Sequence, residues 1–326
     1  MRIAGAPISW GVCEVPGWGR VTDPATVLAE MAALGLRATE LGPPGYLPTD
    51  PARLATLLAG HGMTLVGGFL AVPLHAGDRS AADDAVALLA DAGAEVLVLA
   101  AATGLDGYDE RPTLTGGQWR ELVDTAAAIR DRAAARGVRT ALHPHVGTHV
   151  ERADEVERFL ADSDLPLCLD TGHLLIGGAD PVDLARRFPG RIGHVHLKDV
   201  RADLAAAVRA GDLGYAAAVR QGMYVPLGEG DVDVAALVAL LLAADYRGWC
   251  VLEQDTALGD DVPADAPTRD TARSLAHLDR LVPGPAPEPP PAGPPPAEPS
   301  PTEPPPTEPP PTEPPPTEPP LTEEAR

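Results

Sequence analysis

The most informative part of this sequence is a nine-residue stretch, Arg191-Ile192-Gly193-His194-Val195-His196-Leu197-Lys198-Asp199. Successive side chains of a β-strand point to opposite faces of its sheet, so a strand here puts His194, His196 and Lys198 on one face and apolar residues on the other. The apolar face predicts a covering layer of helices and a buried parallel sheet rather than a solvent-facing one. The polar face predicts a function, because imidazole and amine groups are costly to bury without partners.

Lys198 is the only lysine in the chain, which otherwise uses arginine as its cation. Arginine keeps its proton in proteins, whereas a buried lysine can shift its pKa and exchange protons. We therefore interpret Lys198 as a functional residue. Chance, in a composition biased toward arginine, is the alternative explanation.

Strand and helix patterns alternate eight times through residues 1–282 around this stretch. Strands are predicted at 3–9, 37–41, 64–71, 95–101, 139–145, 165–170, 192–199 and 249–254. Helices are predicted at 24–34, 51–61, 78–91, 115–136, 151–161, 181–188, 233–244 and 267–282, with a partly helical insertion at 200–227. Eight βα units predict an α/β fold closed into a (β/α)8 TIM barrel. An open doubly wound sheet is the alternative, and it is disfavoured because no Gly-x-Gly-x-x-Gly turn follows the first strand.

The segment 283–326 has a different composition from the rest. It is rich in Pro, Glu and Thr and repeats Thr-Glu-Pro-Pro-Pro from Thr302 onward. A segment without apolar periodicity cannot bury a core, so we predict a TIM-barrel catalytic domain over 1–282 and a disordered, extended tail over 283–326. The tail is interpreted as an acidic appendage, with docking to a proline-motif reader as the alternative.

The charge and cysteine content narrow the class of protein. The formal net charge is −22, which argues against binding nucleic acid or an anionic membrane and favours cation binding. The three cysteines are widely spaced, which predicts reduced thiols in a cytoplasmic protein. The amino terminus has no signal-peptide pattern, and no apolar run is long enough to span a membrane. Whether the chain forms a homo-oligomer is left open.

Histidines and carboxylates gather where the later strands end, which in a βα barrel is the working end. Six of the nine histidines fall between 143 and 196. Period-2 alternation turns one residue inward from each of four successive strands: His143, Asp170, His196 and Glu253. Two imidazoles and two carboxylates predict a divalent metal site, with Mn²⁺ or Co²⁺ first and Zn²⁺, Fe²⁺ or Mg²⁺ as alternatives.

The chain carries six motifs of one known type, at residues 6–11, 38–42, 143–148, 169–173, 194–200 and 253–255. They resemble those of the xylose-isomerase-like barrel superfamily of sugar phosphate isomerases and epimerases, and within it most closely those of the inosose dehydratases. The resemblance implies one metal ligand from each of the fifth to eighth strands, carried over as His143, Asp170, His196 and Glu253, with His145 as the alternative fifth-strand ligand. It implies dehydration of a keto-cyclitol such as 2-keto-myo-inositol; isomerisation or epimerisation of a keto sugar or hydroxypyruvate-like substrate is the alternative.

Such chemistry needs proton carriers and substrate contacts near the metal. His173 and Glu151 are the predicted proton carriers, and Lys198 is predicted to hold the ketone oxygen or neutralise enolate charge. His145 and His194 are expected to orient ligands or bind hydroxyls.

Three further residues have two alternative roles each. Trp10 and Trp18 are expected either to stack on the cyclitol or to pack against the loops. Glu40 contacts the substrate or anchors the second strand. A non-catalytic sugar-binding barrel is a further alternative, whereas a DNA endonuclease conflicts with the acidic charge.

Overall fold

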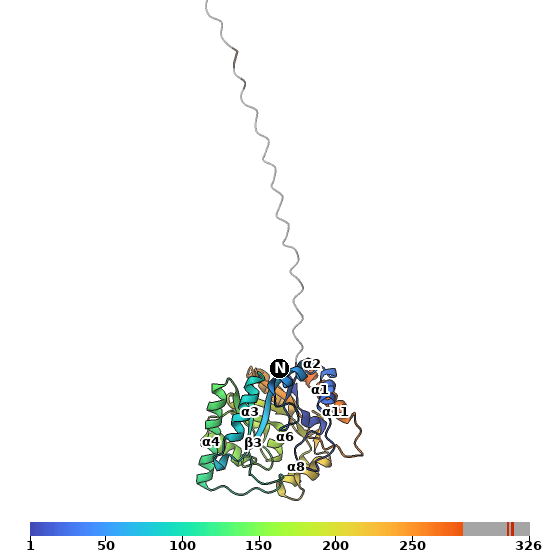
Figure 1. Ribbon diagram of the computed structural model, residues 1–326. Helices are drawn as coiled ribbons and strands as arrows, with labels where there is room; N and C mark the ends of the chain where they lie inside the picture. The colour runs from blue at the N-terminus through green and yellow to red at the C-terminus, as the bar shows by residue number, and fades with distance from the viewer. Residues whose placement is uncertain (283–311, 313, 316–326) are drawn as a thin grey trace, which may run out of the picture. The chain divides into compact units, whose positions relative to one another are not determined.

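The computed structural model describes residues 1–282, 312, 314 and 315, so the predicted disordered tail lies almost wholly outside the described residues. Eight parallel strands close into a barrel in the order β1-β10-β7-β6-β5-β4-β3-β2. Figure 1 shows helices on the outside of the strands. The predicted TIM barrel is therefore confirmed. The barrel strands are β1 (Arg2–Gly5), β2 (Ala38–Glu40), β3 (Thr64–Val72), β4 (Val96–Ala101), β5 (Arg139–Leu142), β6 (Leu167–Asp170), β7 (Ile192–Leu197) and β10 (Trp249–Leu252).

Helices follow the strands and form the outer layer. They are α1 (Pro24–Ala33), α2 (Pro51–Gly60), α3 (Ser80–Asp91), α4 (Gly116–Ala135), α5 (Ala153–Asp162), α6 (Thr171–Ile176), α7 (Pro181–Arg187), α8 (Ala202–Ala210), α9 (Tyr215–Arg220), α10 (Val234–Ala243) and α11 (Ala266–Leu281). The Asp-Pro pairs start helices as predicted: Asp23, Asp50 and Asp180 each accept a backbone N–H of the first turn, and proline follows. None of the described helices is both long and apolar enough to cross a membrane.

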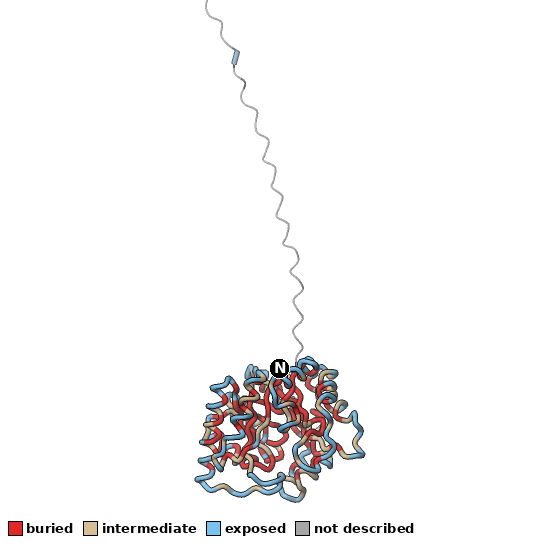
Figure 2. The backbone as a smooth tube through the Cα atoms, in the orientation of Figure 1, coloured by how far each residue is buried: buried red, intermediate tan, exposed pale blue. Residues whose placement is uncertain are grey.

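The apolar core has two layers, and both are buried while the periphery is exposed (Figure 2). Inside the barrel the strands contribute mainly small side chains, namely Ala4, Ala6, Ala38, Val66 and Val251 in one cluster and Val96, Val98, Ala141 and Cys168 in another. Between barrel and helices the larger residues pack, including Leu97, Leu142 and Leu169. This is the alternation expected of strands that are buried on both faces.

The predicted strands run too long at their carboxyl ends. β5, β7 and β10 end at Leu142, Leu197 and Leu252 instead of residues 145, 199 and 254. Pairing to the neighbouring strand persists for one more residue, since the His143 N–H donates to the Leu99 carbonyl at 2.8 Å. The chain then leaves the strand and turns at the mouth, where the His145 N–H donates to the Val150 carbonyl at 3.0 Å. The side chains that follow the strands can therefore converge.

The first predicted strand, 3–9, was also too long. β1 is followed by a 3₁₀ turn, Pro7–Trp10. Proline lacks the N–H that strand pairing would use, which accounts for the early end of β1.

The insertion at 200–227 folds over the mouth as α8, α9 and a short antiparallel pair, β8 (Asp199–Val200) with β9 (Tyr224–Val225). The buried carboxylate of Asp199 fixes the loop after β9. It accepts backbone N–H groups from Val200, Gly228, Gly230 and Val232 at 2.8–3.0 Å. Asp199 is thus a structural residue, although it adjoins Lys198.

Candidate metal centre and active site

The side chains of the four predicted ligands meet at the carboxyl end of the barrel. His143 Nε2 lies 3.2 Å from His196 Nδ1 and 3.3 Å from Asp170 Oδ2. His196 Nδ1 lies 3.5 Å from Asp170 Oδ2 and 3.1 Å from Glu253 Oε2. All four residues are buried. Donors held about 2.0–2.2 Å from a common ion stand at such separations from one another.

Asp170 shows how the chain prepares one donor of this set. It ends β6 and caps α6, where its Oδ1 accepts the His173 N–H at 2.8 Å. Its Oδ2 is fully buried and makes no hydrogen bond of regular geometry among the described residues, and the Lys198 ammonium lies 3.3 Å from it. Burial opposes ionisation of Asp170, but the Lys198 ammonium outweighs it and holds the pKa of this carboxyl well below its ordinary value. A buried carboxylate oxygen that faces two imidazole nitrogens fits a divalent cation.

The balance of charge supports the same conclusion. Four buried carboxylates surround this point, namely Glu40, Asp170, Glu253 and Asp255, and Lys198 supplies the ammonium among them. Buried charge is costly unless it is compensated. The donor set and its excess of negative charge therefore fit a divalent ion. One ligand atom each of Asp170, His196 and Glu253 lies within 4.8 Å of the other two.

Glu40 determines how His196 is oriented. Its Oε1 lies 2.8 Å from His194 Nε2 and 3.2 Å from His196 Nε2. Burial opposes a charge on His196, but Glu253 and Glu40 outweigh it and raise the pKa of this imidazole well above its ordinary value, so a bound ion would have to displace the proton on Nδ1. With Nε2–H donating to Glu40, the deprotonated Nδ1 would then point to His143, Asp170 and Glu253. Glu40 thus orients an imidazole of β7, His194 shares the same carboxylate, and Glu40 also lines the cavity of the site, so both predicted roles of Glu40 stay open.

Lys198 is an ammonium held by three carboxylates. Its Nζ lies 2.8 Å from Asp255, 3.1 Å from Glu253 and 3.3 Å from Asp170. Burial opposes the charge, but these carboxylates raise the pKa of Lys198 well above its ordinary value. The amine therefore stays protonated, which suits it to hold a developing oxyanion or donate a proton and not to act as a base.

His173 and His145 lie beside this ammonium. His173 Nε2 is 3.2 Å from Lys198 Nζ, and the rings of His173 and His145 are 3.8 Å apart between centroids. Burial lowers the pKa of His173 well below its ordinary value, and burial with neighbouring His143 lowers the pKa of His145 to about 3. Both rings are therefore neutral, and His173 can accept a proton at the atom next to Lys198.

Three residues that the sequence interpretation did not assign complete the site. Asp255 Oδ2 accepts a hydrogen bond from Tyr215 Oη at 2.6 Å, and Tyr215 Oη lies 2.9 Å from Tyr224 Oη. Period-2 alternation past Glu253 was a signal for Asp255. The tyrosines come from the insertion, whose position over the barrel follows from tertiary packing and not from any local pattern.

The entrance to the site is lined by aromatic side chains from separate loops. Trp18 and Tyr108 line the cavity that reaches His145 and Lys198. The Trp18 ring lies 6.3 Å from each of the rings of Tyr108 and Tyr215. Trp10 does not line this cavity. It is fully buried, and its indole N–H donates to Glu30 at 2.7 Å, so its position supports loop packing and not stacking on substrate.

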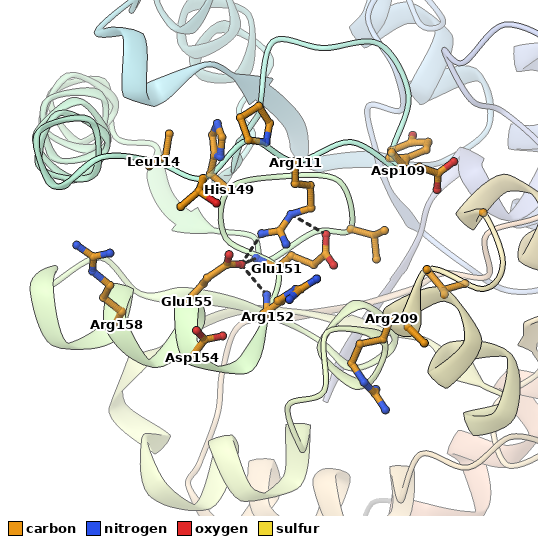
Figure 3. Close-up of a pocket in the computed structure, with 18 of the residues that line it drawn as sticks. Asp109, Arg111, Leu114, His149, Glu151, Arg152, Asp154, Glu155, Arg158 and Arg209 are labelled. Atoms are coloured by element: carbon orange, nitrogen blue, oxygen red, sulfur yellow. Dashed lines mark hydrogen bonds and ion pairs between the residues drawn. The ribbon is translucent and has the colours of Figure 1, made fainter.

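Glu151 lies outside the cluster of proposed ligands, among the residues of a second cavity (Figure 3). Its carboxylate pairs with Arg111 Nε at 3.0 Å and accepts the Gly147 N–H at 2.7 Å. It lines a separate cavity of about 780 Å³ beside the loop 103–114. The structure therefore does not bring Glu151 together with the other predicted residues, and its position gives the predicted role in proton transfer no support.

Comparison with known proteins places these observations in context. The family model described as "Xylose isomerase-like TIM barrel" matches residues 28–281. An inosose dehydratase of Geobacillus kaustophilus (strain HTA426) is 34% identical over 301 residues, 86% of this chain and 94% of that protein. The rhizopine catabolism protein MocC of Rhizobium meliloti is 36% identical over 268 residues, 78% of this chain and 82% of that protein.

Solved structures match at lower sequence identity and therefore bear on the fold alone. The probable 3-DHS dehydratase AsbF of Bacillus anthracis has a TM-score of 0.64 at 17% identity, covering 86% of this chain and 99% of that one. An L-ribulose 3-epimerase has a TM-score of 0.61 at 19% identity, covering 86% and 93%.

Proposed function

This chain belongs to the xylose isomerase-like TIM barrel family of enzymes, and we propose that within it the protein is a metal-dependent dehydratase of a keto-cyclitol such as 2-keto-myo-inositol. The observation that carries the proposal is the juxtaposition of two sets of groups. Four metal-type donors converge at 3.1–3.5 Å, and Lys198 and His173 lie beside them with 3.2 Å between their nitrogens. The curated relatives named inosose dehydratase supply the substrate class.

The residues proposed to hold the metal are His143, Asp170, His196 and Glu253, with Mn²⁺ or Co²⁺ as the ion. His143 is preferred to His145 as the fifth-strand ligand, because His143 Nε2 lies 3.2 Å from His196 Nδ1 and 3.3 Å from Asp170 Oδ2, whereas the His145 ring lies beside the His173 ring with 3.8 Å between centroids. The bound ion supplies Lewis acidity that makes the carbon beside a ketone easier to deprotonate. Glu40 keeps His196 in the tautomer that this binding needs.

The proton chemistry follows from His173 and Lys198. In the proposed reaction, His173 Nε2 takes the proton from the carbon next to the ketone. The Lys198 ammonium gives a proton to the departing β-hydroxyl, which leaves as water. The 3.2 Å separation then lets protonated His173 return its proton to Lys198, so both groups are restored.

Asp255 has a positioning role in this scheme. It holds Lys198 Nζ at 2.8 Å on one oxygen and Tyr215 Oη at 2.6 Å on the other. The charged side chain is thereby fixed beneath the aromatic entrance. Trp18 and Tyr108 are proposed to contact the apolar face of the cyclitol ring, since aromatic side chains suit such faces.

The test is turnover of 2-keto-myo-inositol by protein reloaded with Mn²⁺ or Co²⁺. Turnover is monitored through the ultraviolet absorbance of the unsaturated or dione product. Asp170→Asn should bind less metal and lose at least about 100-fold in turnover, above the range for loss of an outer-shell partner. Trp10→Phe is the matched control at the same end of the barrel, and it should keep turnover.

The reaction run in D₂O separates dehydration from epimerisation. A dehydratase yields product with one water fewer. An epimerase yields a substrate isomer that has gained deuterium at the carbon beside the ketone and has kept all its hydroxyls. Deuterium gain without water loss would replace the dehydratase proposal by the epimerase one, and full turnover by Asp170→Asn would refute the metal site.

A further inference from the structure

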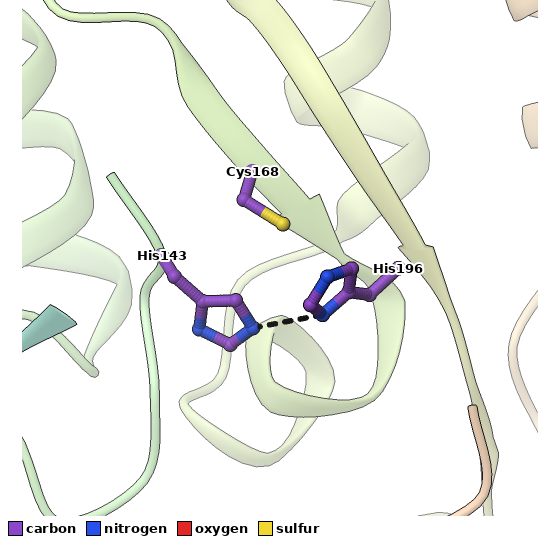
Figure 4. Close-up of side chains that lie close together, drawn as sticks. All are labelled: His143, Cys168 and His196. Atoms are coloured by element: carbon purple, nitrogen blue, oxygen red, sulfur yellow. Dashed lines mark hydrogen bonds between the residues drawn. The ribbon is translucent and has the colours of Figure 1, made fainter. Parts of the chain in front are cut away.

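Cys168 lies inside the barrel, directly below the donor cluster. It precedes Asp170 by two residues on β6, so both side chains point to the barrel interior. Its neighbours in the inner core are Val96, Val98 and Ala141, not the leucines of the outer layer. Figure 4 shows its sulfur directed toward the region between the rings of His143 and His196.

This sulfur is within reach of the imidazoles of the proposed metal centre. One nitrogen of His143, one nitrogen of His196 and the Cys168 Sγ all lie within 4.8 Å of one another, and all three residues are buried. A second observation is consistent with a cation at the same place. The buried Asp170 Oδ2 lies 3.3 Å from His143 Nε2 and 3.5 Å from His196 Nδ1, and the Lys198 ammonium also lies 3.3 Å from it.

The two imidazoles therefore belong to two alternative donor sets. With Asp170 and Glu253 they form a set of two nitrogens and two oxygens, which suits a harder ion such as Mn²⁺. With Cys168 they form a set of two nitrogens and one sulfur, which suits thiophilic Zn²⁺ or Cd²⁺. A tetrahedral ion needs sulfur and nitrogen about 3.5 Å apart, given Zn–S near 2.3 Å and Zn–N near 2.0–2.1 Å. Side-chain adjustment within the 4.8 Å cluster must supply the difference.

We propose that Cys168 gives the barrel interior a second mode of metal binding. In this mode His143, Cys168 and His196 hold a thiophilic divalent ion. On binding, the S–H bond of Cys168 breaks, a metal–sulfur bond forms and the proton passes to the buffer. The ion takes over the same imidazoles that the carboxylate set needs, so the two modes exclude each other. That a thiophilic ion in this mode would prevent catalysis rests on the proposed function, whereas the binding mode itself does not.

The decisive measurement is X-ray absorption on protein loaded with one equivalent of Zn²⁺, without substrate. The wild type should show a sulfur neighbour at about 2.3 Å in addition to nitrogen neighbours. Cys168→Ala should lose the sulfur neighbour. Cys250→Ala is the matched control, because Cys250 is equally buried on β10 but packs in the outer core; it should retain the sulfur neighbour.

A wild-type spectrum that shows nitrogen and oxygen neighbours but no sulfur neighbour would overturn the proposal. This outcome is measured on the wild type, so it does not depend on the folding of any variant. A sulfur neighbour that persists in Cys168→Ala would overturn it as well. Loading with Mn²⁺ should give no sulfur neighbour, and a manganese–sulfur distance would refute the selectivity argued here. Because none of these spectra depends on turnover, a protein inactive on keto-cyclitols can still confirm the second binding mode.

Discussion

The two ends of the barrel use the same kinds of charged residue in opposite ways. At the amino end, Glu95 pairs with Arg2 at 2.5 Å and Arg139 at 3.4 Å, accepts the Trp249 indole N–H at 3.0 Å, and the Arg2 guanidinium stacks on the Trp249 ring. The side chains of Arg2, Glu95 and Arg139 are 38–52% exposed. Each charge there has a partner and water beside it.

At the carboxyl end the charged side chains are 0–8% exposed, and carboxylates outnumber the Lys198 ammonium. Water cannot screen these groups, so each depends on its neighbours or on an ion. An end built only for stability would resemble the amino end. The buried excess of carboxylate marks the carboxyl end as the place where this chain accepts stability costs for function.

Replacement of Lys198 should have the largest effect of those predicted from this contrast. Lys198→Met removes the ammonium beside Asp170, Glu253 and Asp255, and with it the proposed proton donor. We expect kcat to fall by about 10²–10⁴-fold, the usual contribution of a positioned general acid. Metal content, measured by atomic absorption, should be retained. Unchanged turnover would show that the lone lysine has no catalytic part.

Replacement of Glu40 by glutamine should have the second-largest effect. The amide can still contact His194 and His196, but it lacks the negative charge of Glu40 and no longer selects one tautomer of His196. Loss of such an outer-shell partner typically weakens metal affinity by about 10–100-fold. Titration with Mn²⁺ should show this weakening. Glu40→Asp, which keeps the charge and shortens the reach, should restore part of the affinity, and equal affinity for all three proteins would contradict the orienting role.

The contrast between the ends also explains which features were predictable from sequence. Strand alternation and the Asp-Pro helix starts are local patterns, and they predicted the closed barrel and the inward set His143, Asp170, His196 and Glu253. Convergence at the barrel mouth follows directly once eight parallel strands close.

What the sequence did not reveal depends on loops. Tyr215 reaches Asp255 because the insertion folds over the mouth, and Glu151 is drawn away by Arg111 of the 103–114 loop. Trp10 and Trp18 follow the same strand, yet only Trp18 lines the cavity. Partners far apart in sequence decide each case, and no local pattern encodes them.

Acid should weaken the carboxyl end through its buried histidines. The pKa of His145 falls to about 3 on burial, against about 6.5 in the unfolded chain. Because the folded pKa is depressed, the stabilising contribution is present above pH 6.5 and is lost as pH falls toward 3. At pH 5 the loss is about 2 kcal/mol.

Urea unfolding in chelator at pH 7.5 and pH 5 measures this loss. His145→Asn should lose less stability between the two pH values than the wild type, by about that amount. His61→Asn, a partly exposed histidine at the end of α2, is the control and should follow the wild type. Identical pH dependence for wild type and His145→Asn would mean that His145 does not stay neutral on folding.

The smallest effect is expected at the amino end. Glu95→Gln removes the charge that Arg2 and Arg139 share, but all three side chains are more than one-third exposed, so water and salt already screen the interaction. We expect a loss of less than about 1 kcal/mol in the free energy of unfolding, shrinking further at high salt, with metal content and turnover unchanged. A loss of activity here would show that the amino end contributes to the site, and the division of the barrel into a stabilising end and a working end would fail.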